Sequence, residues 1–548
     1  MIEMIKLLTN YNAVDCDQPW SKEVSKEKRM KQNQNCIDCV DTYTSFGQII
    51  DDAISRCPER EAIIFEGERI TYGQLGQFVN QTSRYMQRIG IRKGSMVAVI
   101  SRNCPEFIIT EFALYRLGAV AVKLNWRLTP AEMAYILELN NVTHAFFQPE
   151  KDAWGKELLE TFDSRVCFTL MNSWDGRPGL RECIAGEDGS PVEVAAQRED
   201  TACHLHTSGT TGYPKCVVHT HGGMLGELKS ALKSYHYPDG QRYQYIAQLF
   251  HSAAIGAHLS LATGGTMILK SRFVLDDYMK TLTEERVNAI SVIPTILKWI
   301  LDEFDQKRYD LSALNTINYS TCPIPPVLLE RAISRLHCKF YQSYGMTEMN
   351  SIVTCLSPED HEIDGGAHLT SVGRPIEGAE VKIVDNDGRE CGTNEPGEIW
   401  VKGPGCMKGY FKRPDLNKEV FVDGWYRTKD VGYLDSYGYL NLCGRADDLI
   451  ISGGENIYPG EILNIIMQLN NDIAEAAVYG VEDAVWGEHV KASIVRMPGS
   501  TITEDDIIQY CRANMPSYRV PKEVEFLSEL PKNSTGKVLL TELRKKRA

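Results

Sequence analysis

The chain has 548 residues, of which 43% are hydrophobic and 24% charged, and its formal net charge is −14 at pH 7. This length exceeds one ordinary core, so we expect roughly two to four structural units. The acidic balance argues against nucleic acid as a partner, and no run approaches the ~20 apolar residues of a membrane span. Sixteen cysteines without a spaced framework indicate free thiols in a reducing, cytoplasmic location rather than disulfides or a zinc site.

Residues 1–42 are polar, and we interpret them as an N-terminal extension. Regular alternation begins near residue 44. Apolar runs typical of strands, at 96–100, 119–122 and 266–269, alternate with helical patterns at 106–117, 130–139 and 294–304. This alternation predicts an α/β fold built on mostly parallel sheets with helices.

The pattern changes from about residue 372, where strands become shorter and turns more frequent. Apolar runs at 381–384 and 398–401 flank an Asp-Gly pair at 387–388, which indicates a β-rich segment with hairpins. Near residues 444–448 the chain passes into a last unit of about 100 residues, which has an α+β pattern.

Residues 207–215 carry the most informative motif, Thr-Ser-Gly-Thr-Thr-Gly-Tyr-Pro-Lys. Glycines let backbone N–H groups approach a ligand, and hydroxyls with a lysine suit phosphate oxygens. The run does not match the common NTPase loop, and a polar surface loop is the alternative interpretation. We expect it to bind a polyphosphate through Thr207, Ser208, Gly209, Thr210, Thr211, Gly212 and Lys215.

Four further motifs follow in order: Tyr-Gly-Met-Thr-Glu at 344–348, Trp-Tyr-Arg-Thr-Lys-Asp at 425–430, Gly-Arg-Ala-Asp-Asp-Leu-Ile at 444–450, and Pro-Lys-Asn-Ser-Thr-Gly-Lys at 531–537. Each alone could be an ordinary turn, a linker or a solvated charge. Together they resemble the adenylate-forming superfamily, and in particular its acyl- and aryl-CoA synthetases.

This resemblance implies a fold and a set of roles. The fold is a large N-terminal domain of several subdomains (43–446), with mostly parallel sheets and a β-rich part, followed by a small mobile α+β domain (447–548). The implied nucleotide residues are Tyr344 for adenine, Thr347 for phosphate, Glu348 for Mg2+, and Asp430 and Arg445 for ribose. The implied residues of the second domain are the hinge Asp447, the coenzyme A residues Gly453, Gly454 and Trp486, and the catalytic Lys537.

The acyl site has a weaker signal. His251, in the Phe-His pair at 250–251, occupies the place of such a pair in acyl- and aryl-CoA synthetases and is the candidate catalytic residue; a core histidine is the alternative interpretation. No aspartate for an α-ammonium group stands between 248 and 256, so we expect a carboxylic acid with an uncharged tail, aromatic or short-to-medium aliphatic. The resemblance places His251, Gly256, Thr321, Cys322 and Gly345 around it.

The expected function is therefore that of an AMP-forming carboxylic acid–CoA ligase using ATP, Mg2+ and coenzyme A. Two alternatives stay open at this point: a stand-alone adenylating enzyme that loads a carrier protein, and a non-catalytic nucleotide-binding protein on the same scaffold. The oligomeric state, including a homodimer, is also left open. The family usually has glycine where this chain has Lys429.

Overall fold

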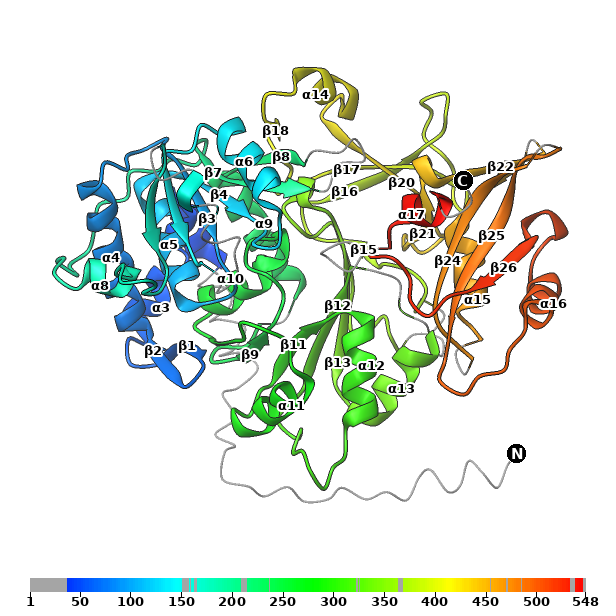
Figure 1. The fold of residues 1–548 in the computed structure, drawn as a ribbon, viewed down its shortest axis with the longest axis horizontal. Helices are drawn as coiled ribbons and strands as arrows, with labels where there is room; N and C mark the ends of the chain where they lie inside the picture. The colour runs from blue at the N-terminus through cyan, green and yellow to red at the C-terminus, as the bar shows by residue number, and fades with distance from the viewer. Residues whose placement is uncertain are drawn as a thin grey trace.

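The computed structural model describes residues 37–149, 157, 159–161, 165–207, 214–235, 237–321, 324, 326–362, 368–453, 455–469, 472–483, 485–532 and 538–545. These residues form four β-sheets with helices packed against them (Figure 1). The first three sheets come from the part of the chain before residue 446, and the fourth comes from the C-terminal part.

The first sheet has seven strands in the order β18-β8-β7-β4-β3-β5-β6. Its strands β4, β3, β5, β6 and β7 run parallel, and such strands read as continuous apolar runs because helices cover both faces. Val97 and Val99 pack toward the α5 side, whereas Ala98 and Ile100 pack toward α6. The bounds are β3 Met96–Ile100, β4 Val120–Leu124, β5 His144–Phe147, β6 Cys167–Leu170, β7 Thr201–Thr207, β8 Lys215–Thr220, β18 Gly409–Tyr410, α4 Tyr72–Arg88, α5 Pro105–Leu117, α6 Pro130–Leu139, α8 Leu180–Ile184 and α9 His221–Ser234.

The second sheet has nine strands in the order β15-β14-β13-β12-β11-β9-β10-β1-β2, with antiparallel pairs at its edges. Helices α11 to α13 cover one face, and α10 lies in the core shared with the first sheet. The bounds are β1 Glu61–Phe65, β2 Glu68–Thr71, β9 Arg242–Tyr245, β10 Thr266–Leu269, β11 Ala289–Val292, β12 Thr316–Ser320, β13 Lys339–Tyr344, β14 Thr354–Leu356, β15 Arg374–Pro375, α3 Asp51–Arg56, α10 Ile255–Ala262, α11 Leu275–Glu284, α12 Pro294–Glu303 and α13 Pro326–Leu336.

The third sheet is antiparallel and carries the β-rich segment. It has the order β16-β17-β20-β19, and β21 pairs with β20. The bounds are β16 Glu380–Val384, β17 Gly397–Lys402, β19 Phe421–Val422, β20 Trp425–Leu434, β21 Leu440–Arg445 and α14 Pro414–Val420. The expected hairpin is present, because β16 and β17 pair antiparallel from Glu380↔Lys402 to Val384↔Glu398.

The fourth sheet belongs to the C-terminal part, drawn in orange and red in Figure 1. It has the order β23-β22-β25-β24, with β26 beside β25, and its core includes residues of α15 and α16. The bounds are β22 Ile450–Ser452, β23 Glu455–Ile457, β24 Ile473–Asp483, β25 Gly487–Arg496, β26 Glu523–Phe526, α15 Pro459–Ile466, α16 Glu504–Asn514 and α17 Leu540–Lys545.

This architecture confirms the expected α/β class, with a large N-terminal part and a smaller α+β part. Residues 37–42 are helical, and Ile37 and Val40 are buried in the main core, so packing begins within the predicted extension. Within the ranges given above, no helix is both long and apolar enough to span a bilayer.

Candidate active site

The predicted phosphate loop connects two antiparallel strands of the first sheet. β7 ends at Thr207 and β8 begins at Lys215, and these two residues are paired across the strands. The loop residues Ser208, Gly209, Thr210, Thr211 and Gly212 lie outside the described residues. The hairpin therefore fixes the two ends of the motif at the edge where β18 joins β8.

Tyr410 links the end of this hairpin to the predicted magnesium residue. It lies on β18, and the Lys215 ammonium is 5.3 Å from the centre of its ring. Its hydroxyl donates a hydrogen bond of 2.7 Å to Glu348 Oε1 and lies 3.2 Å from the Tyr426 hydroxyl. The structure thus brings Lys215 and Glu348 to the same side chain, although they lie far apart in the sequence.

The predicted adenine and ribose residues are in direct contact. The Tyr344 hydroxyl donates to Asp430 Oδ2 at 2.6 Å, and an Arg445 guanidinium nitrogen donates to Asp430 Oδ1 at 2.9 Å. Asp430 and Arg445 are paired residues on β20 and β21, and Tyr344 ends β13. Burial raises the pKa of Tyr344, so its hydroxyl keeps its proton as a donor.

Thr347 and Glu348 lie in a short 3-10 helix, Thr347–Met349, directly after β13. The Thr347 carbonyl accepts from His219 Nε2 at 2.8 Å, and the Glu348 carbonyl accepts from the Met407 N–H at 2.7 Å. Burial lowers the pKa of His219 to about 4, so the ring is neutral at pH 7. Main-chain carbonyls of both predicted ligand residues are therefore held by segments from other parts of the chain.

The Glu348 carboxylate fits a magnesium–nucleotide site. Its Oε1 accepts from Tyr410, and it is a hard oxygen donor of the kind that Mg2+ prefers. Among the described residues, no group of three or more acidic, histidine or cysteine side chains could hold a metal without other ligands. Mg2+ at Glu348 would thus rely on nucleotide phosphate oxygens for further ligands, as is usual for this ion.

Lys429 adopts a backbone conformation that explains why glycine is usual at this position in the family. Its φ is +62°, in the left-handed region that glycine adopts without strain. Its ammonium lies 3.1 Å from Glu419 on α14, so its charge is balanced by that carboxylate. The lysine therefore stands, beside Asp430, in a conformation that favours glycine.

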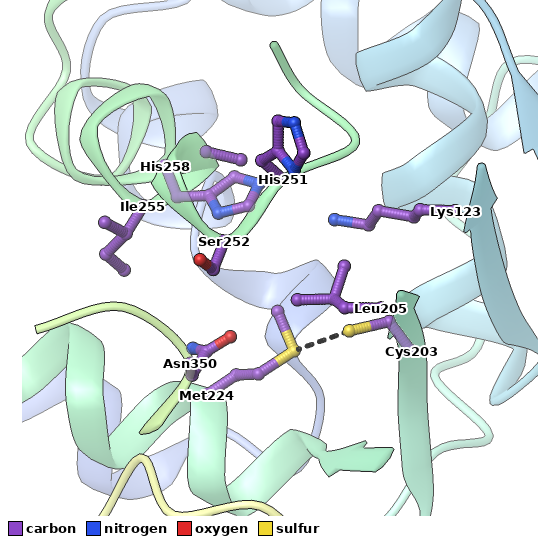
Figure 2. Close-up of a pocket in the computed structure, with 10 residues that line it drawn as sticks. Lys123, Cys203, Leu205, Met224, His251, Ser252, Ile255, His258 and Asn350 are labelled. Carbon is purple, nitrogen blue, oxygen red and sulfur yellow. Dashed lines mark hydrogen bonds between the residues drawn. The ribbon is translucent and has the colours of Figure 1, made fainter. Parts of the chain in front are cut away.

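His251 is the one predicted acyl-site residue among those that line the cavity in Figure 2. The cavity has a volume of about 10 Å³, the size of a single water, and lies between β4, β7, α9 and α10. Burial, together with the positive charge of Arg127, lowers the pKa of His251 to about 4. The ring is therefore neutral at pH 7, and it can donate or accept a hydrogen bond but not form an ion pair.

A buried charged network that the sequence analysis missed lies beside this cavity. Lys123 reaches from β4 into the cavity, and His258 lies across it (Figure 2). Lys123 forms an ion pair with Glu111, which also accepts from Tyr115 at 2.8 Å and contacts His258 Nε2 at 3.0 Å. Burial alone would raise the pKa of Glu111, but Lys123 and then His258 lower it to about 2. The Lys123–Glu111 ion pair therefore adds no net charge beside the predicted acyl residues.

The other predicted acyl residues are placed as follows. Gly256 lies in α10, and an added Cβ would come 2.8 Å from the Tyr243 hydroxyl. Thr321 is exposed at the end of β12 with φ +84°, which is strained for a β-branched residue. Cys322 lies outside the described residues. Their role in binding an acid stays a prediction.

Gly345 is required by the backbone of its own loop. An added Cβ would lie 1.6 Å from the Ser351 carbonyl oxygen, because the chain folds back so that the Val353 N–H donates to the Tyr344 carbonyl. The glycine thus lets the predicted adenine and metal residues stand on one tight loop, which the Tyr344–Val353 hydrogen bond closes.

The predicted residues of the C-terminal part fall into two places. Asp447 is exposed in a 3-10 helix, Ala446–Asp448, that joins β21 to β22, as a hinge would. Gly453 and Trp486 are adjacent: the Gly453 N–H donates to the Trp486 carbonyl at 2.8 Å, and the indole is 51% exposed. Gly454 and Lys537 lie outside the described residues.

A second set of basic groups was also missed. The guanidinium groups of Arg102 and Arg127 lie 3.9 and 4.3 Å from the Trp126 ring, whose indole N–H donates to Gln248. Arg127 is close enough to His251 to affect its pKa. An acidic protein that binds anionic substrates must gather positive charge locally, and these arginines supply it near the predicted acyl site.

Comparison with known proteins agrees with this geometry. Residues 50–411 match the family described as AMP-binding enzyme, and residues 463–537 match the AMP-binding enzyme C-terminal domain. A feruloyl-CoA synthase of Amycolatopsis is 33% identical over 89% of this chain and 96% of its own length. A fatty acid–[acyl-carrier-protein] ligase of Streptomyces coeruleorubidus is 30% identical over 89% and 93%.

A solved structure has the same fold. It is the o-succinylbenzoate CoA synthetase of Bacillus subtilis in complex with its acyl-adenylate intermediate, with a TM-score of 0.80 and 30% identity over 92% of this chain and 99% of that one. The expected resemblance to adenylate-forming enzymes is confirmed, because the first family match alone covers residues 50–411. The chain therefore belongs to the AMP-binding enzyme family.

Proposed function

We propose that this chain is an AMP-forming ligase that joins a carboxylic acid to coenzyme A. The observation that carries the proposal is that Lys215 and Glu348 meet at Tyr410, and Tyr344 and Arg445 meet at Asp430, although these residues come from three different sheets and the helix after β13. These residues provide a cation and a carboxylate for the triphosphate, and an aromatic ring with a carboxylate for the nucleoside.

In the first step the acid's carboxylate attacks the α-phosphate of ATP and releases pyrophosphate. Asp430 accepts hydrogen bonds from the ribose hydroxyls, while Arg445 and Tyr344 hold the carboxylate of Asp430 in place. Mg2+, when bound at Glu348, would neutralise phosphate charge. Lys537 supplies positive charge to the transition state.

In the second step the coenzyme A thiol attacks the acyl carbon and displaces AMP. A carboxylate is a poor electrophile, and the adenylate provides the leaving group that it lacks. The segment at Asp447 is the proposed hinge, and rotation about it would replace Lys537 by the Gly453 and Trp486 face. The exposed indole of Trp486, with the Lys522 ammonium 4.8 Å from its ring centre, suits a nucleotide base and phosphate.

ATP–pyrophosphate exchange with the purified chain tests the first step. A panel of benzoates, cinnamates and straight-chain acids should include acids that drive exchange, and addition of coenzyme A should then yield a thioester and AMP. Absence of exchange with every acid would favour the non-catalytic alternative. Product formation only with a phosphopantetheinylated carrier protein would favour the carrier-loading alternative.

We expect the preferred acid to have an uncharged tail of modest size. Residues 252–256 carry no charged side chain, and the buried Lys123 ammonium is balanced by Glu111, so no buried charge there is left to pair with a second ionic group of the acid. Thr321→Gly should shift kcat/KM toward longer acids, because it removes a side chain at the predicted pocket wall and also relieves the φ of +84°. A wild type that prefers palmitate, or that requires an amino or second carboxylate group, would contradict this prediction.

A cytoplasmic location, a homodimer and the domain boundary at residues 446/447 are further predictions. The thirteen described cysteines that are free support a reducing compartment. The oligomeric state is measured directly by light scattering during size-exclusion chromatography.

A further inference from the structure

One buried acidic side chain, Glu227, has no place in the mechanism above. It lies on α9 with 1% of its surface exposed, and no ion pair involves it in the part of the chain that the structure describes. A buried carboxyl group without a cation is destabilising unless hydrogen bonds satisfy it. Its contacts therefore indicate its structural role.

Both carboxyl oxygens of Glu227 face the loop after the 3-10 helix Thr347–Met349. Oε1 accepts from the Ile352 N–H at 2.8 Å, and Oε2 accepts from the Asn350 side-chain amide. Glu227 belongs to another element, more than 120 positions earlier in the chain. The two bonds thus tie α9 to the segment that carries Thr347 and Glu348.

Asn350 passes this restraint to the predicted phosphate and metal residues. It is the C-cap of the 3-10 helix, with φ +62°, and its N–H donates to the Thr347 carbonyl at 3.0 Å. Its side chain also lines the small cavity next to His251 (Figure 2). Asparagine adopts this left-handed conformation more readily than most residues, and the hydrogen bond to Glu227 fixes its side chain there.

We propose that Glu227 is a positioning residue for nucleotide binding, which fixes the 347–352 loop so that Thr347 and Glu348 face the triphosphate. The inference rests on the proposed function. It predicts that loss of Glu227 weakens binding of magnesium–ATP selectively, because its two hydrogen bonds hold the segment that carries Thr347 and Glu348, while binding of the carboxylic acid changes little.

The test compares Glu227→Ala and Glu227→Gln in the full-length enzyme. The KM for magnesium–ATP of Glu227→Ala should rise about tenfold, because two buried donors lose their acceptor, while the KM for the acid stays within about twofold. Burial raises the pKa of Glu227 to about 8, so its carboxyl is largely neutral at pH 7. Glutamine has the same shape: its oxygen can accept from the Ile352 N–H, and its NH2 can donate to Asn350 once that amide turns to present Oδ1, so Glu227→Gln should restore most of the affinity. Calorimetric titration with magnesium–ATP gives the same comparison without turnover.

Leu228→Ala is the matched control, since Leu228 is fully buried on the same helix and belongs to the main core. It should lower the melting temperature without changing the KM for magnesium–ATP. Asn350→Gly provides a second route if Glu227→Ala does not fold, because glycine accepts the φ of +62° while losing the amide. It should raise the same KM.

Three results would overturn the inference: an unchanged KM in both Glu227→Ala and Asn350→Gly, an equal rise in Leu228→Ala, or a Glu227→Gln enzyme as impaired as Glu227→Ala. A wild type that lacks exchange with every acid contradicts the proposed function instead. Calorimetry with magnesium–ATP still tests Glu227 in that case.

Discussion

Gly345→Ala is expected to reduce ATP–pyrophosphate exchange by more than about 100-fold, because a shift of about 1 Å in a catalytic group has that effect. The added Cβ would lie 1.6 Å from the Ser351 carbonyl oxygen and 2.9 Å from the Ile352 Cα, and both are backbone atoms. No side-chain rotation can relieve the contact. The loop must open, and Tyr344 and Glu348 then separate from Asp430 and Tyr410.

Gly186→Ala is the control for this substitution. No atom lies within 4 Å of the position of its added Cβ, and its φ is not in the left-handed region. Exchange activity of Gly186→Ala should equal that of wild type. A Gly345→Ala enzyme with normal exchange and a normal melting temperature would show that the loop adapts, and would contradict the tight-loop account.

The strands and helices with strong periodicity could be predicted closely from the sequence. Strand β3, strand β10 and helix α6 have the expected bounds, and α12 ends one residue earlier than expected. These elements are apolar on the faces that contact the core, so local pattern and tertiary packing agree. The two-residue strands β15, β18 and β19 have no such signal, since long-range pairing alone defines them.

The candidate active site also contains residues with a local sequence signal and residues that only long-range contacts reveal. Tyr344, Asp430 and Arg445 were predicted because each belongs to a contiguous motif, and the structure places them in contact. Tyr410 has no motif around it, and its importance is visible only once β18 pairs with β8. The Glu111–Lys123 pair was missed for a related reason, because it joins a helix to a strand inside the core.

Two positions that involve glycine show what the sequence could predict and what only the structure reveals. The family resemblance placed Gly345 at the acyl pocket, whereas the contacts show a backbone requirement that no sequence pattern reveals. The exchange of glycine for lysine at position 429 was visible in the sequence. Its φ of +62° and its partner Glu419 come only from the structure.

Lys537→Ala is expected to slow adenylation by about 100 to 1,000-fold, as loss of one preorganised charge at a transition state typically does, or ~2.7–4 kcal/mol. The prediction depends on the motif at 531–537, since Lys537 lies outside the described residues. Thioester formation from a supplied acyl-adenylate should be largely unaffected, because the charge that Lys537 stabilises develops only when the carboxylate attacks phosphorus. The two half-reactions are measured separately, by pyrophosphate exchange and by AMP release from the synthetic adenylate.

Lys532→Ala is the matched control, because it removes the same charge from the same segment. Lys532 forms an ion pair of 2.7 Å with Glu475, and 36% of its side chain is exposed. Exposed pairs of this kind contribute about 0–1 kcal/mol, so both half-reactions should stay within a few-fold of wild type. If Lys537→Ala slowed the two half-reactions equally, Lys537 would act in both steps or only in folding. The two-orientation account would then lose its main support, because one face of the C-terminal part would have to serve both reactions.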